Sequence, residues 1–233
     1  MNIAIVGATG NVGRKLIEVL EKKQFPIDEL FLIASSKSVG KKINFKGKEH
    51  SIHDLESFDF SSVKIAFFSA GSAVADKWAP IAAQNAIVID NSKFFRMDPD
   101  VPLIVPEVNS KDLKDYKKKN IIANANCSVI PLVVALKPLH DLYNIKRIVA
   151  STYQSVSGAG KAPMDELLSQ TKDFFEGKEL NSKLFTKQIA FNAIPHIDSF
   201  LEDGYTKEEQ KMHDEVKKIL DSKIKITSTS VRI

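Results

Sequence analysis

The sequence of 233 residues contains one cysteine, one tryptophan and no apolar run long enough to span a membrane. A single cysteine excludes an internal disulfide, and a lone thiol is typical of a reducing compartment. A membrane-spanning helix needs about 20 apolar residues. The first apolar segment ends at Gly7 and lacks the basic start of a signal peptide. These absences predict a cytoplasmic protein with no membrane segment.

Neither sign of charge dominates, since 33 Lys and Arg stand against 29 Asp and Glu, giving a formal net charge of +4. Nucleic-acid-binding proteins concentrate basic side chains and often interleave them with aromatic ones. The lysine run at 117–119 is short and contains no aromatic side chain. The Cys, His, Asp and Glu residues do not show metal-ligand spacing. We therefore expect neither a nucleic-acid partner nor a metal.

Apolar runs alternate with amphipathic stretches in the first half, which predicts a largely parallel sheet joined by helices. The first helix, at 12–22, places Val12, Leu16, Val19 and Leu20 on one expected apolar face. In this half we expect strands at 2–6, 30–34, 63–69, 86–90, 103–105 and 121–123, and a second helix at 73–84. In the second half we expect helices at about 127–136, 162–176 and 207–220, and strands at 146–154 and from 224.

A glycine motif, Gly7-Ala8-Thr9-Gly10-Asn11-Val12-Gly13, lies between the first strand and the first helix. Glycines allow a tight turn, a close approach of a pyrophosphate and close helix–strand packing, while free amides at the helix start face the phosphates. The residues expected to contact the dinucleotide are Gly7, Thr9, Gly10, Asn11, Val12 and Gly13. The alternative is a glycine-rich turn that binds no ligand.

The end of the second strand predicts which dinucleotide is bound. NAD sites usually place a carboxylate there to bind the ribose hydroxyls. This chain instead has Ser35, Ser36, Lys37 and Ser38, whose hydroxyls and cation suit a 2′-phosphate. We therefore expect NADP, the alternative being an ordinary polar turn.

The only cysteine, Cys127, follows Asn126 at the expected start of a helix. The helix dipole and free amides at such a position favour a thiolate, and together with Asn126 they could stabilise an oxyanion on an attacked carbonyl. A buried, inert thiol is the alternative. A thiol combined with a nicotinamide indicates hydride transfer to a carbon held on sulfur, which needs an acid–base group. On residue type alone, His196 is the candidate base.

Several motifs in order resemble those of aspartate-semialdehyde dehydrogenases. The motifs are Gly7–Gly13, Asp90-Asn91-Ser92 with Phe95-Arg96, Val105–Asn109, Asn126-Cys127-Ser128, Tyr153–Gly160 and Ile194–Asp198. The resemblance covers the whole chain. It implies NADPH-dependent reduction of β-aspartyl phosphate to aspartate semialdehyde and phosphate, on the route to lysine, threonine and methionine, by an enzyme that is at least a homodimer.

The resemblance also implies roles for individual residues. Cys127 resembles the nucleophile, and Gln154 the residue that orients the substrate. Arg96 and Lys211 resemble phosphate-binding residues, Glu208 the contact of the substrate amine, and Arg232 the residue that binds the substrate carboxylate. Without the resemblance, Arg96 would be interpreted as a surface arginine, and Glu208 with Lys211 as a solvated salt bridge. Gly71, Ser157 and Gly158 are expected to line the cofactor site.

The chain also departs from the family pattern. The catalytic histidine of the family lies a few residues beyond the position of Arg232, where this sequence ends, so we expect a fragment or a shortened chain. His196 lies in a different motif, to which the resemblance gives no catalytic role, so His196 is not the expected base. Two alternatives remain, namely another acyl-phosphate reductase of the N-acetyl-glutamyl-phosphate reductase type and a non-catalytic NADP-binding protein.

The predicted fold class is α/β. A Rossmann-type NADP-binding domain is expected over residues 1–126, and an incomplete α+β catalytic and dimerisation domain over residues 127–233.

Overall fold

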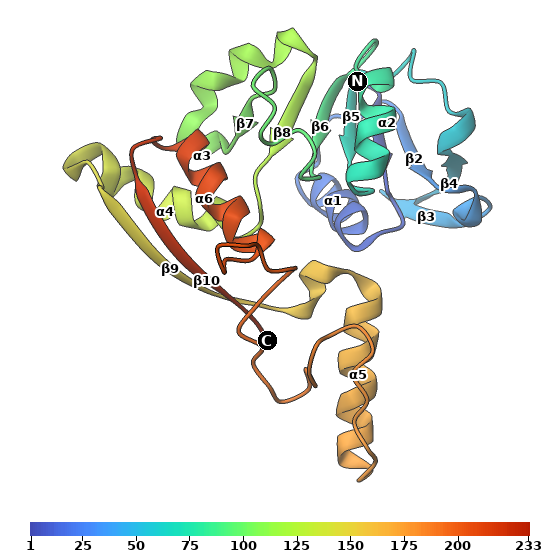
Figure 1. The fold of residues 1–233 in the computed structure, drawn as a ribbon. Coiled ribbons are helices and arrows are strands. Elements are labelled where there is room, and N and C mark those ends of the chain that lie inside the picture. Colours follow the sequence, from blue (N-terminus) through green and yellow to red (C-terminus); the bar gives the residue numbers. More distant parts are fainter. The chain divides into compact units, whose positions relative to one another are not determined.

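The computed structural model describes all residues from 1 to 233, and the chain forms two compact units, Met1–Asn126 and Cys127–Ile233 (Figure 1). No helix is long and apolar enough to cross a membrane.

The first unit is built on an eight-stranded sheet with the order β3-β4-β2-β1-β5-β6-β8-β7. All neighbouring strands are parallel except β3 and β4, which pair antiparallel. The strands are β1 (Ile3–Val6), β2 (Leu30–Ala34), β3 (Lys42–Phe45), β4 (Lys48–Asp54), β5 (Ile65–Phe68), β6 (Ile87–Asp90), β7 (Leu103–Ile104) and β8 (Ile121–Asn124). The chain crosses from β1 to β2 on one side and later returns to β5 on the other, as in doubly wound folds.

The helices of the first unit are α1 (Asn11–Lys22), α2 (Ser72–Ala82) and α3 (Pro106–Asn109), with 3-10 turns η1 (Ser36–Ser38), η2 (Leu55–Ser57) and η3 (Ser110–Lys118). The antiparallel hairpin of β3 and β4 is absent from the strands expected at the outset. Strand β3 alternates polar and apolar residues over only four positions, and β4 contains a single apolar residue, Ile52, so the strand pattern is short and weak.

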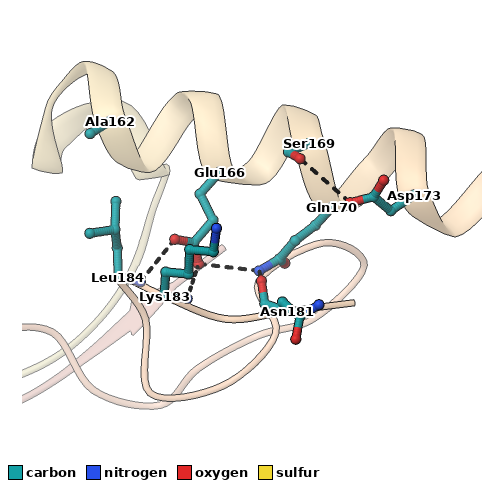
Figure 2. Close-up of a pocket in the computed structure, with 8 residues that line it drawn as sticks. All are labelled: Ala162, Glu166, Ser169, Gln170, Asp173, Asn181, Lys183 and Leu184. Carbon is teal, nitrogen blue, oxygen red and sulfur yellow. Dashed lines mark hydrogen bonds between the residues drawn. The ribbon is translucent and has the colours of Figure 1, made fainter. Parts of the chain in front are cut away.

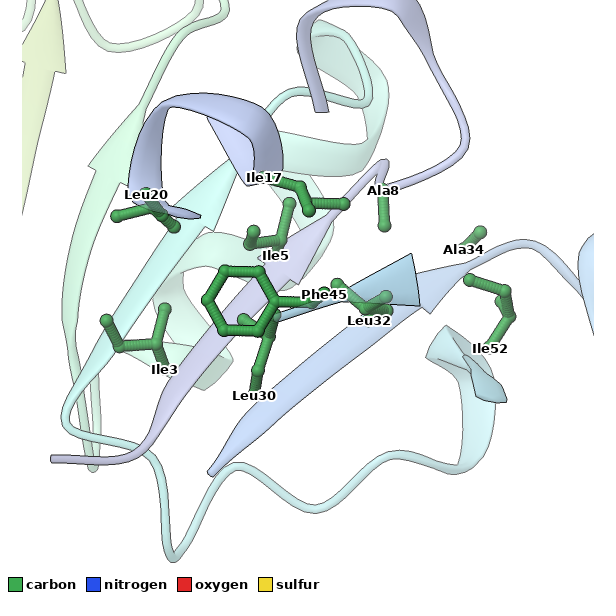
Figure 3. Close-up of a cluster of buried hydrophobic side chains, with 10 residues drawn as sticks. All are labelled: Ile3, Ile5, Ala8, Ile17, Leu20, Leu30, Leu32, Ala34, Phe45 and Ile52. Carbon is green, nitrogen blue, oxygen red and sulfur yellow. The ribbon is translucent and has the colours of Figure 1, made fainter. Parts of the chain in front are cut away.

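The apolar face predicted for α1 is partly wrong. Gly13, Ile17 and Leu20 are the buried residues of this helix, whereas Val12 and Val19 are 51% and 41% exposed. The reason is that Gly13 must face the turn after β1, because it lies too close to that backbone to carry a side chain. This contact fixes the face that includes Ile17 and Leu20. Figure 3 shows both side chains over Ile3, Ile5, Leu30 and Leu32 of the sheet.

The second unit contains a two-stranded parallel sheet of β9 (Arg147–Gln154) and β10 (Lys225–Arg232). Its register pairs Arg147 with Lys225 at one end and Gln154 with Arg232 at the other. The helices are α4 (Val129–Tyr143), α5 (Lys161–Phe175) and α6 (Lys207–Ile219), and η4 (Val156–Ala159) follows β9. Helix α6 packs against both β10 and α4.

Helix α4 differs at both ends from the expected range 127–136. It begins at Val129 with Ser128 as its N-cap, so Cys127 lies in the turn before the helix. At the other end it continues through Pro138 to Tyr143. A proline inside a helix removes one backbone donor, but here the apolar sequence continues and the helix ends only at Asn144, whose φ is +55°.

Buried polar groups hold helix α5 against the segment that follows it. Glu166 accepts the amide N–H groups of Lys183 and Leu184 at 3.2 and 2.8 Å, and Gln170 accepts those of Ile189 and Ala190 at 2.9 and 3.1 Å. Figure 2 shows Glu166 and Gln170 pointing from the helix towards the segment that carries Lys183 and Leu184. These residues line a hollow of about 390 Å³. The chain then continues to Ile194, whose backbone pairs with that of Arg232 on β10.

Candidate functional site

The turn after β1 and the first turn of α1 each contain a position that requires glycine. Gly7 has a φ of +88°, and a Cβ atom there would lie 2.8 Å from the carbonyl carbon of Ser69. A Cβ atom on Gly13 would lie 2.3 Å from the Gly7 oxygen. No side chain fits within these distances. The glycine motif therefore forms a tight turn that leads directly into α1.

This turn lies at the carboxyl ends of β1 and β5, where the direction of strand crossing reverses. The Ser69 amide N–H donates to the Val6 oxygen at 2.9 Å, which places the chain after β5 beside the glycine turn. Gly71, two residues further on, is the N-cap of α2 and has a φ of +89°. Two helix N-termini with glycine caps, those of α1 and α2, suit a pyrophosphate. The residues present therefore fit a dinucleotide.

The four residues that predict NADP follow β2 directly. Ser35 is the N-cap of η1, and Ser36 and Lys37 are exposed, whereas Ser38 is buried. Three of the four are thus accessible to a 2′-phosphate. Their role remains a prediction.

Arg96 is buried, and not the exposed arginine of the alternative interpretation, with only 8% of its surface accessible. Its Nε donates to the Asn124 oxygen at 2.9 Å and a terminal nitrogen donates to the Asn91 oxygen at 3.0 Å. It thereby ties together the ends of the neighbouring strands β6 and β8. Burial raises the pKa of Asp90, although hydrogen bonds from Ser92 and the charge of Arg96 oppose this effect.

In the second unit, a chain of hydrogen bonds joins β9 to α6. Thr152 Oγ1 donates to Gln154 Oε1 at 2.9 Å, and Gln154 Nε2 donates to Glu208 Oε1 at 3.2 Å. The other carboxylate oxygen of Glu208 accepts from Lys211 Nζ at 2.9 Å. Glu208 is 8% exposed. The pair is therefore part of a half-buried hydrogen-bonded cluster, unlike a solvated salt bridge.

Arg232 lies beside Gln154 because the two residues are paired in the parallel register of β9 and β10. Its guanidinium donates to the Ser155 oxygen at 2.6 Å, and only 7% of the residue is exposed. Burial lowers the pKa of Arg232, while the charges of Glu208 and Cys127 act in the opposite direction. The exposed thiol of Cys127 thus lies within electrostatic range of this guanidinium.

Lys211 keeps its charge in this cluster. Burial alone lowers its pKa, but hydrogen bonds and negative charge from Glu208, followed by Asp198, raise it above the usual value of 10.5. A guanidinium within electrostatic range of an exposed thiol, with an ammonium in the same cluster, suits an anionic substrate that a nucleophile can attack.

The remaining predicted cofactor residues of this unit, Ser157 and Gly158, are exposed in η4. A Cβ atom on Gly158 would lie 3.5 Å from the Arg232 guanidinium, which is ordinary van der Waals contact. Asn126, the last residue of the first unit, is buried. The roles predicted for these three residues remain predictions.

Two carboxylates that position the cluster have no role in the sequence prediction, namely Asp198 and Glu209. Asp198 ends the motif Ile194–Asp198, but the sequence gives it no role. In the structure its carboxylate accepts a hydrogen bond from Lys211 Nζ at 3.1 Å. Glu209 completes a capping box with Thr206 at the start of α6 and also accepts the Ser230 amide N–H. A Thr-x-x-Glu spacing at a helix start was the available signal for Glu209.

Comparison with protein families places this architecture in a class. A semialdehyde dehydrogenase NAD binding domain matches residues 2–116, and a semialdehyde dehydrogenase dimerisation domain matches residues 136–233. The chain thus has the domain order of a nicotinamide-dependent oxidoreductase, with a dinucleotide domain followed by a dimerisation domain.

Individual relatives narrow this class. The chain is 57% identical to an aspartate-semialdehyde dehydrogenase of Aquifex aeolicus, over 99% of this chain and 69% of that protein. It is 52% identical to aspartate-semialdehyde dehydrogenase 2 of Vibrio cholerae, over 100% and 69% of the two chains. A crystal structure of the Vibrio cholerae enzyme II complexed with ASA matches with a TM-score of 0.98 and 52% identity, over 100% and 70% of the two chains. The chain belongs to the aspartate-semialdehyde dehydrogenase family.

Proposed function

We propose that the protein catalyses the NADPH-dependent conversion of β-aspartyl phosphate to aspartate semialdehyde and phosphate. The observation that carries this proposal is that Arg232 lies within electrostatic range of the only cysteine. Hydrogen bonds and strand pairing connect Arg232 to Gln154, Glu208 and Lys211. The names of the relatives support an aspartyl substrate over the acetylated glutamyl substrate of the alternative reductase.

Each group of the cluster suits one part of that substrate. The Arg232 guanidinium suits the α-carboxylate, because a planar guanidinium can donate two parallel hydrogen bonds to one carboxylate. The Glu208 carboxylate suits the substrate amine, and the Lys211 ammonium the phosphate. For Arg96, in the first unit, the proposed role in phosphate binding rests on the family resemblance and on its planar donors.

The chemistry uses the Cys127 thiolate as nucleophile. It attacks the acyl carbon, and the bond from that carbon to the phosphate oxygen breaks with its electron pair leaving on phosphate. The product on the protein is a thioester. A nicotinamide dinucleotide, when bound by the glycine turn, supplies the hydride that reduces this carbon. Departure of the Cys127 thiolate then releases the aldehyde and restores the nucleophile.

The proposed dinucleotide is NADP. Ser35, Ser36 and Lys37 are accessible at the end of β2, and no carboxylate occupies that turn to bind a free ribose hydroxyl. We further propose that the protein works as a homo-oligomer, at least a dimer, through its dimerisation domain.

The single cysteine makes the nucleophile directly testable, because a thiol reagent can label only Cys127. Aspartate semialdehyde is expected to slow alkylation of this thiol by iodoacetamide, whereas N-acetyl-glutamate semialdehyde is not. Cys127→Ala is expected to abolish turnover and to leave the dissociation constant for NADP unchanged. Turnover that survives this substitution would refute the nucleophile. NADP binding with neither turnover nor protection of the thiol would identify a non-catalytic NADP-binding protein.

A further inference from the structure

Lys211 lies between two carboxylates, only one of which belongs to its own helix. Its Nζ donates to Glu208 Oε2 at 2.9 Å and to Asp198 Oδ2 at 3.1 Å. An ammonium group has three N–H donors, so the third is left for a ligand. The side chains of Lys211 and Asp198 are 21% and 34% exposed, which keeps the bridge at the accessible edge of the cluster.

The segment that carries Asp198 is fixed at both ends to the elements that form the cluster. At one end, the backbone of Ile194 exchanges two hydrogen bonds of 2.9 and 2.8 Å with that of Arg232 on β10. At the other end, the Ser199 oxygen accepts the Lys207 amide N–H at 2.9 Å, at the start of α6. Asp198 is therefore held against the strand of Arg232 and the helix of Lys211 together.

The local backbone also sets the direction of the Asp198 side chain. Asp198 has a φ of +70°, a left-handed conformation that aspartate tolerates better than most residues. Its Oδ1 accepts the Ser199 amide N–H at 2.9 Å, which leaves Oδ2 for Lys211. A lysine side chain has four rotatable bonds and loses considerable entropy when it is held in one place. A carboxylate on a separate, fixed segment holds the lysine side chain in place before the substrate binds. Less side-chain entropy is then lost on substrate binding.

We propose that Asp198 is a positioning residue that holds the Lys211 ammonium in place for the phosphate group of the substrate. This inference rests on the proposed function, because that function assigns the phosphate to Lys211. Asp198 also adds negative charge that helps to raise the pKa of Lys211 against the effect of burial, and so keeps the ammonium protonated.

Two effects of Asp198 on phosphate oppose each other. Its charge repels the phosphate directly, whereas its bond to Lys211 places the ammonium that attracts the phosphate. A double-mutant cycle separates them, because direct repulsion persists when Lys211 is removed and positioning does not.

The experiment measures the dissociation constant of inorganic phosphate by calorimetry, which requires no turnover. It compares the wild-type protein with Asp198→Asn, Lys211→Ala and the double variant. We expect Asp198→Asn to weaken phosphate binding about three- to five-fold in the wild-type background, as for a partly exposed ion pair. In the Lys211→Ala background the same substitution should not weaken binding. Asp198→Glu, which keeps the charge, should retain most of the affinity.

Asp221→Asn is the control for loss of a carboxylate that accepts a nearby backbone N–H, because Asp221 Oδ1 accepts the Lys223 amide N–H at 2.9 Å. It should leave phosphate binding unchanged. Unchanged or tighter binding in Asp198→Asn, or equal weakening in both backgrounds, would overturn the positioning role. If Lys211→Ala does not affect phosphate binding, the phosphate assignment fails, and the inference fails with it. The melting temperature of each variant shows whether weaker binding merely reflects unfolding.

Discussion

Glu209 and Ser230 are joined by a hydrogen bond of 2.9 Å from the Ser230 amide N–H to Glu209 Oε1. The other oxygen of the same carboxylate accepts the Thr206 amide N–H at 2.7 Å. Glu209 thus caps α6 and ties it to β10, two residues before Arg232. The relative position of Glu208, Lys211 and Arg232 depends on this buried carboxylate.

Glu209→Gln is expected to destabilise the protein, because an amide offers one acceptor where the carboxylate offers two. A buried N–H left without a partner costs about 1–3 kcal/mol. Denaturation by urea should show a free energy of unfolding lower by about this amount. Glu202→Gln, at an exposed glutamate, is the control and should change little. Equal stability of the two variants would show that the bonds of Glu209 contribute nothing.

Gly13→Ala is expected to disrupt the nucleotide turn. The new Cβ atom would lie 2.3 Å from the Gly7 oxygen, so backbone must shift, at a cost of about 1–3 kcal/mol for overpacking. Gly10→Ala is the comparison for stability, since its Cβ atom would lie 3.3 Å from the same oxygen. Thermal unfolding should rank Gly13→Ala well below Gly10→Ala, and the affinity of Gly13→Ala for NADP should fall. Equal melting temperatures would contradict the packing role of Gly13.

His213 predicts a pH dependence of stability. Burial, together with the charge of Lys217, lowers its pKa below 6.5, although the carboxylates of Asp214, Glu209 and Asp203 oppose this. The unfolded state therefore takes up a proton first as the pH falls. The stabilisation is complete above the unfolded-state pKa and is lost as the pH falls through the folded-state pKa.

His213→Gln should remove this contribution. The stability difference between wild type and variant is expected to shrink as the pH falls from about 7.5 to about 5. Urea denaturation across this range tests the expectation, with His53→Gln as the control at an exposed histidine. A difference that stays constant with pH would mean that His213 does not titrate differently in the two states.

Family comparison confirmed the predicted fold class, the predicted family and the prediction of a nicotinamide-dependent oxidoreductase. The fold class was predicted from the alternation of strands and helices, and the other two from ordered motifs. Such motifs can be recognised in a sequence because each one is a contiguous stretch whose residue types are needed for one local backbone conformation. The glycine motif is the clearest example. Gly7 and Gly13 are needed where a tight turn meets a helix, and this need can be inferred from the order strand, glycines, helix.

Other features depended on contacts between distant segments. The hairpin of β3 and β4 joins the sheet because β4 pairs with β2. Its own sequence is a weak signal, since β3 is four residues long and β4 contains one apolar residue. The buried face of α1 was set by the close approach of Gly13 to Gly7, which outweighed the apolar spacing of Val12 and Val19.

By itself the sequence determined the dinucleotide turn, the succession of strands and helices, and the single thiol, because these depend on neighbouring residues. Only the tertiary structure decided that Arg96 is buried, that Gln154 pairs with Arg232, and that Asp198 contacts Lys211. These relations arise from strand register and from a segment fixed at both ends. The register and the fixed segment depend on hydrogen bonds between residues far apart in the chain, and a local sequence pattern cannot predict such bonds.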